Sequence, residues 1–197
     1  MKSAIIILLI SIISLSLNAQ MAYKLVEKPD EGSCFNYDIE DEKGKLIKLP
    51  KHIRESLLCP YSVGLNGNFL TYVDGLKVKL YNLKTKEDHQ LFTLYEDIDG
   101  FSFPAWSKSG KEVMFVIINQ QMKHDYKSMC RIIYLKLNDN GSIESKRKFD
   151  RAVNFDCGSV CSSMPGTDFM FDEKGNIKFK IHWSQSEDEE KFETIEL

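Results

Sequence analysis

The sequence predicts an all-β protein of 197 residues, and three observations support this class. Turn-forming pairs such as Asn66-Gly67, Asp74-Gly75 and Asn140-Gly141 recur along the chain. The segments between such turns are short and rich in β-branched and aromatic residues, as strands are. No long stretch of the chain after the first 20 residues shows the apolar spacing of 3.6 residues that is typical of an amphipathic helix.

The first 20 residues have the pattern of a secretory signal peptide. Lys2 supplies a positive start, and residues 4–17 form an uncharged, mostly apolar run that ends just before Ala19. The run is shorter than the roughly 20 residues of a membrane-crossing helix. We therefore expect a signal peptide at 1–19, a single all-β domain at 20–197, export to the periplasm or the cell exterior, and no stable membrane span after cleavage. An uncleaved anchor or a buried helix is the alternative.

The next elements are a turn, a strand and one short helix. The turn Asp41-Glu42-Lys43-Gly44 leads into a strand-like segment at 45–49. Residues 51–58 form the one helical segment, which Pro60 ends.

A β-hairpin is predicted next. Strands at 70–73 and 76–81 flank Asp74-Gly75, a pair that accepts the positive backbone angles of a tight two-residue turn. In the second strand, Leu76, Val78 and Leu80 alternate with lysines, which predicts one buried and one solvated face.

Two continuous apolar runs follow in the second half of the chain. Residues 113–118 and 130–137 predict central strands of a sheet that is packed on both faces. The polar residues 120–127 between them are interpreted as a long loop. A turn at 172–175 precedes a last strand at 177–181.

An internal repeat links these elements. Residues 62–73 align without gaps with residues 105–116, at an offset of 43, and residues 162–171 repeat the form. A period in the forties with several strands in each unit is typical of propeller blades. We expect repeats at 61–103, 104–150 and 160–197, in a short or incomplete β-propeller of about four antiparallel blades. A two-layer antiparallel β-sandwich is the alternative.

The segment Phe103-Pro104-Ala105-Trp106-Ser107-Lys108-Ser109-Gly110-Lys111 resembles the TolB-type, WD-like β-propeller repeat. The core of that repeat is Pro-x-Trp-Ser-Pro-Asp-Gly-Lys followed by an apolar strand, and the likeness covers about residues 97–137. Lys108 and Ser109 stand where the repeat has Pro and Asp. The resemblance implies structural roles for Pro104, Trp106, Ser107 and Gly110, with Trp106 filling space between blades.

No catalytic, cofactor-binding or metal-binding motif is recognisable. The four histidines stand singly rather than at metal-ligand spacing: His52, His89, His124 and His182. Cys130 follows His124 by six residues, but we interpret it as a buried or disulfide-bonded strand residue, not a nucleophile. We therefore expect no catalytic residue, no metal and no cofactor.

All five cysteines lie after the predicted signal peptide, in a compartment where disulfides can form. The candidates are Cys34, Cys59, Cys130, Cys157 and Cys161. At least one bridge is expected, but the pairing cannot be read from the sequence, and the odd count leaves at least one thiol unpaired.

The net charge of the chain indicates which classes of binding partner to expect. The 26 basic and 29 acidic residues give a net charge of −3, which offers no support for nucleic-acid binding. Glu96, Asp97 and Asp99 precede the repeat motif and are candidates for a binding loop at the rim of the propeller. We expect an exported, non-catalytic interaction protein of the cell envelope whose partner is another envelope or secreted protein. The alternatives are a carbohydrate- or peptide-active enzyme or its accessory module, and a structural envelope protein.

Overall fold

A computed structural model describes residues 23–28, 36–57, 64–94, 100–124, 127–156, 168–184 and 191–197. The predicted signal peptide lies outside these ranges. The described part of the chain is almost entirely β-strand, with one helix, and none of its helices is long and apolar enough to cross a membrane. Its elements are β1 (Tyr23–Lys28), β2 (Asn36–Asp41), α2 (Lys51–Ser56), β3 (Gly64–Asn66), β4 (Phe69–Asp74), β5 (Lys77–Asn82), β6 (Asp88–Thr93), β7 (Gly100–Phe101), β8 (Ala105–Trp106), β9 (Glu112–His124), β10 (Lys127–Leu137), β11 (Ile143–Asp156), β12 (Phe169–Phe171), β13 (Ile177–Ser184) and β14 (Lys191–Ile195).

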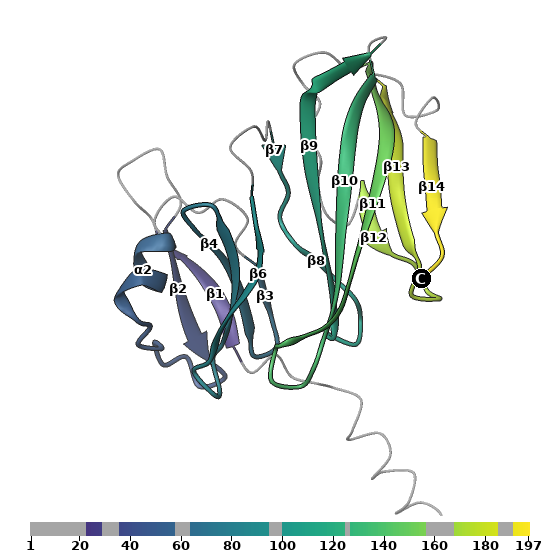
Figure 1. Cartoon of the computed structure of the whole chain (residues 1–197). Coiled ribbons are helices and arrows are strands. Elements are labelled where there is room, and N and C mark those ends of the chain that lie inside the picture. The colour runs from purple at the N-terminus through teal and green to yellow at the C-terminus, as the bar shows by residue number, and fades with distance from the viewer. Residues whose placement is uncertain are drawn as a thin grey trace, which may run out of the picture.

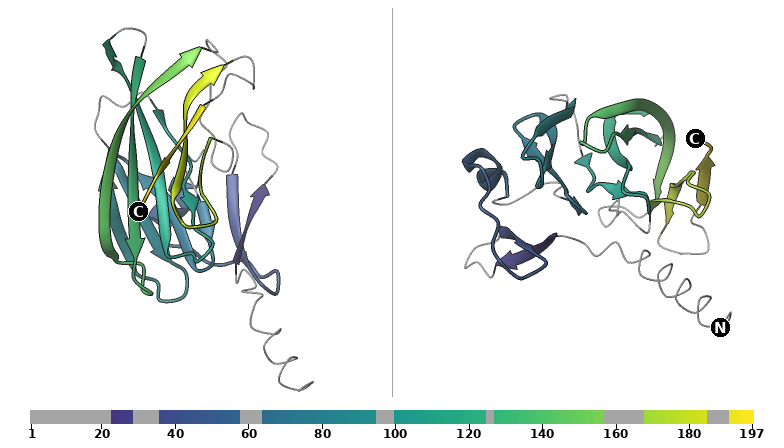
Figure 2. Two further views of the ribbon diagram at one scale, coloured as in Figure 1. Left: turned by 90° about the vertical axis from the view of Figure 1, so that its right-hand side faces the viewer. Right: turned by 90° about the horizontal axis from the view of Figure 1, so that it is seen from below.

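The strands form three sheets (Figure 1). Strands β1 and β2 make an antiparallel hairpin, and β3, β4, β5 and β6 follow one another in a four-stranded antiparallel sheet. The remaining eight strands form one sheet with the order β12-β13-β11-β10-β9-β7, in which β8 pairs with β9 and β14 pairs with β13. All pairings are antiparallel except β11 with β13, which is parallel over three residue pairs. Seen from below, the sheets follow one another in the order of the chain (Figure 2, right).

Three hydrophobic cores follow one another through the fold, two between sheets and one within the curved eight-stranded sheet. The first joins the segment around α2 and Ile39 to one face of the four-stranded sheet, through Leu70 and Tyr72. The second joins the opposite face of that sheet, through Val78 and Leu80, to strands β9 and β10. The third joins the far face of β9 and β10 to strands β12 and β13.

Strand β9 shows how a central strand serves two cores. Val113, Phe115 and Ile117 belong to the second core, whereas Met114 and Val116 belong to the third. Consecutive residues of a strand point to opposite faces, so the continuous apolar run of β9 fills both. A two-layer sandwich buries only one face of each sheet, and sheets stacked in series bury both. The predicted propeller-like all-β class is thus confirmed, including central strands packed on two faces.

One turn geometry recurs along the fold. In four described turns a glycine with positive φ donates its N–H to the carbonyl of the residue three positions earlier. These are Gly44 to Asp41, Gly110 to Ser107, Gly141 to Asn138, and Gly175 to Asp172. The turn predicted at 172–175 is one of these four, and it follows β12. The turn of the third repeat, in residues 162–171, falls mostly in a range that the structure does not describe. Residues 157–167 lie outside the described ranges.

The hairpin of β4 and β5 is shifted by one residue from its prediction. Asp74 pairs with Lys77, so the two turn residues are Gly75 and Leu76 instead of Asp74 and Gly75. Gly75 has a φ of 58°, as the first position of a type II′ turn requires. Leu76 is consequently exposed at the tip, whereas Val78 and Leu80 are fully buried as predicted.

Two further segments differ from the sequence-based expectation. Residues 120–127 are not a long loop, because β9 continues to His124 and β10 begins at Lys127. The hairpin ladder thus extends past the apolar run that marked the strands. Strand β11 was not predicted from the sequence, and it runs for 14 residues because it pairs along β10.

Candidate functional site

The strongest polar cluster of the described residues lies where α2 covers the outer face of the four-stranded sheet. It consists of His52, Tyr72, Asp74, Lys79 and Asp88, and we call it the Asp88 cluster. Tyr72 on β4 pairs directly with Lys79 on β5, so both side chains project from the same face.

Helix α2 follows Leu49-Pro50, and it is held against the sheet by two residues of the first core. Ile53 and Leu57 are fully buried there beside Leu70 of β4. His52, one residue before Ile53, therefore lies at the border between the core and solvent. The apolar anchoring of α2 is thus what brings this histidine to the sheet.

Tyr72 is the most deeply buried member of the cluster. Its ring has no solvent exposure, and its hydroxyl donates to the Asp88 carboxylate with both oxygens at 2.9 Å. Burial raises the pKa of Tyr72 well above its usual range, and the hydrogen bond to Asp88 and the negative charge of Asp88 add to this effect. The phenol is thus a fixed, neutral donor.

Lys79 joins the two carboxylates of the cluster. Its Nζ atom lies 3.1 Å from Asp74 Oδ2 and 3.3 Å from Asp88 Oδ2, and 5.9 Å from the centre of the Tyr72 ring. Burial opposes the charge of Lys79, but the hydrogen bonds and negative charges of both carboxylates outweigh it and raise the pKa of the ammonium. Because both oxygens contact one atom, they lie at most about 6.4 Å apart, so the two carboxylates are close neighbours.

His52 is the most accessible member of the cluster. Half of its side chain is exposed, and its Nε2 atom lies 3.7 Å from Asp88 Oδ2. Its ring centre lies 6.4 Å from that of Tyr72. An imidazole beside a carboxylate is a pair of groups that acid–base chemistry uses.

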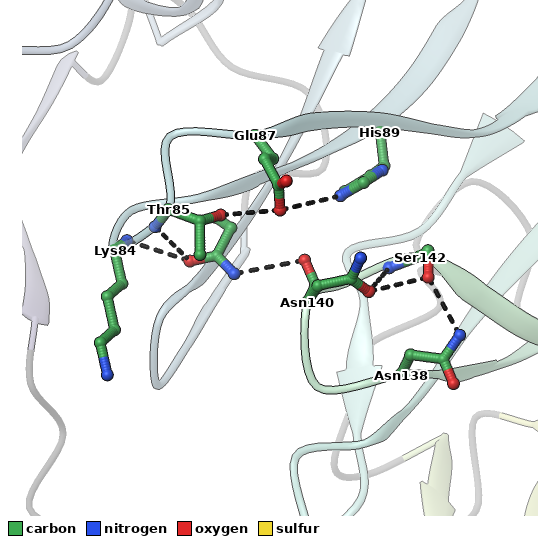
Figure 3. A network of polar contacts seen from close by, with 8 residues as sticks. Lys84, Thr85, Glu87, His89, Asn138, Asn140 and Ser142 are labelled. Atoms are coloured by element: carbon green, nitrogen blue, oxygen red, sulfur yellow. Dashed lines mark hydrogen bonds and ion pairs between the residues drawn. The ribbon is translucent and has the colours of Figure 1, made fainter.

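A second polar network lies at the turns that follow β5 and β10 (Figure 3). The side chain of Asn82 accepts from the backbone N–H groups of Lys84 and Thr85, and its amide donates to the carbonyl of Asn140 at 3.2 Å. This contact ties the four-stranded sheet to the β10–β11 turn, whose Gly141 packs against Leu80.

Glu87 and His89 belong to the same network. Glu87 accepts from the Thr85 hydroxyl at 3.0 Å, and its other contact, with His89 Nε2, is longer at 4.0 Å. That buried ring nitrogen has no hydrogen-bond partner. We interpret the network as a structural link between two sheets, because Asn82 contacts backbone groups of both turns.

The structural candidates from the repeat motif lie at the junction of the four-stranded and the eight-stranded sheet. The Trp106 ring stacks on Phe69, with ring centres 6.3 Å apart and an angle of 7° between planes. Pro104 packs against Gly64 so closely that a Cβ atom there would lie 2.2 Å from Pro104 Cγ. Ser107 accepts from the backbone N–H of Glu112 within the Gly110 turn.

The binding and disulfide candidates mostly fall outside the described residues. The rim-loop residues Glu96, Asp97 and Asp99 and the cysteines Cys34, Cys59, Cys157 and Cys161 all lie in ranges that the structure does not describe. No group of three or more potential metal ligands gathers among the described residues.

Cys130 is the one disulfide candidate that lies within the described residues. Among those residues it is a free, buried thiol in the third core, and burial raises its pKa to about 12. A thiol in this environment is not a ready nucleophile. The other interpretation of Cys130, as a buried strand residue, is the one that the structure supports.

The sequence did not bring the Asp88 cluster together. Asp88 stands in a polar stretch between two strands, 16 residues after Tyr72, and His52 appeared as an isolated histidine. Lys79 had been assigned only to the solvated face of its strand. The one signal in the sequence was the position of Asp88, which is the first residue of β6, the strand that pairs with β5.

Fold and site together define a propeller-like all-β protein with a polar cluster on the outer face of one blade. No family model and no curated protein matches the chain. Two solved structures are similar to it: an oligogalacturonate lyase in complex with manganese, and an oligogalacturonate lyase from Vibrio parahaemolyticus. Each is 12% identical, and the TM-scores are 0.48 and 0.47.

The alignments cover 81% of this chain and 43% of each of those proteins, so the chain spans less than half of their length. Both matched proteins are enzymes, which contradicts the expectation of a non-catalytic interaction protein of the cell envelope, and we withdraw it. At this TM-score the likeness assigns no activity to the chain.

Proposed function

We propose that the chain is an exported carbohydrate-active enzyme, or a module of one, and that the Asp88 cluster is its site. The observation that carries this proposal is the convergence of His52, Lys79 and Asp74 on one face with Asp88. These side chains come from a helix and from three strands or their ends, and the accessible ones offer both donors and acceptors to sugar hydroxyls.

In this proposal His52 is the general acid or base that transfers a proton to or from the substrate. Asp88 stabilises the protonated imidazole and orients it, and Tyr72 and Lys79 hold Asp88 in place from below. Lys79 has three N–H donors and uses two of them on carboxylates, so the third can reach a substrate oxygen.

A carbohydrate fits this arrangement better than a peptide. Peptide hydrolysis through a covalent intermediate needs a serine or cysteine nucleophile beside the histidine. The described residues of the cluster include neither, and the Cys130 thiol lies in a different core. Hydrolysis of a glycosidic bond needs a general acid for the leaving oxygen and a general base for the attacking water. In this proposal His52 and a carboxylate of the cluster fill those two roles.

The test compares the wild-type chain with H52Q and the matched control E55Q, a change on the exposed side of the same helix. Each protein is incubated with a panel of neutral and acidic polysaccharides, and new reducing ends and ultraviolet-absorbing unsaturated products are measured. We expect turnover of at least one polysaccharide, with H52Q slower by about a hundredfold, as for loss of a general acid or base, and E55Q unchanged.

Binding is measured in parallel for each polysaccharide by calorimetry. Saturable binding without turnover that H52Q and D88N weaken identifies an accessory module. The proposal fails if no polysaccharide is bound or cleaved, or if H52Q and E55Q behave alike while circular dichroism shows both folded.

A further inference from the structure

Strand β11 carries three consecutive basic residues in its middle: Lys146, Arg147 and Lys148. Lys146 pairs with Leu135 and Lys148 with Ile133, so both lysines share the face that holds the second core. Arg147 points to the opposite face. On a strand, alternate residues lie about 6.6 Å apart, so the two exposed lysines leave the strand as neighbours on one face.

The end of the Lys146 side chain reaches the neighbouring sheet. Its Nζ atom donates a long hydrogen bond of 3.4 Å to the carbonyl of Leu91 on β6, and it lies 5.4 Å from the centre of the Phe92 ring. The ammonium is thus held at the seam between β6 and β11, against a carbonyl and an aromatic face, with donors to spare.

Other cations on these sheets also have contacts, such as Lys178, whose Nζ atom lies 4.6 Å from the centre of the Phe192 ring. Five of them contact a carboxylate: Lys79, Arg131, Lys136, Arg151 and Lys180. Among the described residues no carboxylate lies within ion-pair distance of Lys146 or Lys148. Burial lowers the pKa of Lys146, and the positive charge of Lys148 lowers it further, so the two ammoniums repel each other without a compensating anion.

We propose that Lys146 and Lys148 together bind a small oxyanion, such as phosphate, at the seam between β11 and β6. A tetrahedral oxyanion presents several acceptor oxygens and two negative charges, so it can accept from both ammoniums at once and remove their repulsion. The same chemistry is offered by free phosphate and by the phosphate group of a phosphorylated sugar.

The experiment titrates the full chain with inorganic phosphate, and separately with glucose 6-phosphate, at constant ionic strength. Lysine side-chain resonances are followed by NMR, and K148Q is compared with K108Q, which removes an exposed lysine from the Ser107 turn. We expect saturable binding that raises the pKa of Lys146. Its affinity is expected to fall about fivefold in K148Q, as for loss of one surface charge contact, and to stay unchanged in K108Q.

The two ligands distinguish the source of the anion. Tighter binding of glucose 6-phosphate assigns the site to a phosphorylated sugar, and tighter binding of phosphate assigns it to the free ion. Equal affinities in K148Q and K108Q overturn the proposal, because they show only non-specific attraction. It is also overturned if the wild type binds neither ligand. Aggregation of K146Q and K148Q in light scattering would then assign the lysines to protection of an exposed sheet edge.

Discussion

The hydroxyl of Tyr72 offers the sharpest test of how the Asp88 cluster is held together. The change Y72F removes one oxygen atom and leaves the aromatic ring in the first core, which also holds Leu70 and Tyr81. It therefore isolates the polar contact from packing, since the ring volume in the core is nearly unchanged.

The size of the effect follows from the geometry. The hydroxyl lies 2.9 Å from both Asp88 oxygens, but it has one proton, so one charge-assisted hydrogen bond is lost. Such bonds contribute about 1.5 to 3 kcal/mol when buried. The Asp88 side chain is 29% exposed and can bind water after the change, so we expect the free energy of unfolding to fall by about 1 to 2 kcal/mol.

Urea unfolding followed by circular dichroism measures this loss, and a double-mutant cycle with D88N isolates the pair. The coupling free energy should be at least about 0.5 kcal/mol. A coupling of zero, or a Y72F protein as stable as wild type with the same denaturant slope, would refute the assigned contact.

The same variant predicts a change at alkaline pH. The pKa of Tyr72 is raised in the folded state, so above pH 10 the unfolded chain loses this proton while the folded chain keeps it. Stability should therefore fall as pH rises above about 10, the pKa of an unperturbed tyrosine. Y72F should show a shallower fall, although Tyr134, whose pKa burial raises to about 12, leaves part of the slope in place.

Two other positions give independent predictions. G141A should lower the free energy of unfolding by about 2 to 4 kcal/mol, because φ is 95° and a Cβ would lie 2.7 Å from Leu80 Cδ2. G44A, in the same turn type with open space around it, should cost only about 1 to 2 kcal/mol in a thermal or urea melt, and equal losses would contradict the clash. The Cys130 thiol should resist alkylation at pH 8 until the chain unfolds, as counted by mass spectrometry, and rapid labelling of the folded protein would contradict its burial.

The sequence predicted the fold well where hydrophobic pattern alone decides it. The unbroken run from Val113 to Ile118 indicated a strand with two buried faces, and the structure divides its residues between two cores. Val78 and Leu80 were predicted on the buried face for the same reason. The prediction that Leu76 is buried was wrong, because the pairing of Asp74 with Lys77 makes Leu76 a turn residue. A hydrophobic pattern cannot fix the strand register to one residue.

The candidate site was not predictable from pattern, because its members lie on different elements. Tyr72 and Lys79 become neighbours only through the register of β4 and β5, and His52 joins them only because Ile53 anchors α2. Strand β11 was missed for a related reason: its charged residues carry no apolar alternation, and its place is set by pairing with β10.

The pairing pattern also has a kinetic consequence. Most sheet contacts join strands that follow one another in the chain, so each hairpin can form by closing a short loop at small entropic cost. The parallel pairing of β11 with β13 is different, since it joins Asn154–Asp156 to His182–Ser184 through only three residue pairs. We therefore expect the hairpins to form early and in any order, and the joining of the last two units to be the late step that makes folding of the eight-stranded sheet cooperative.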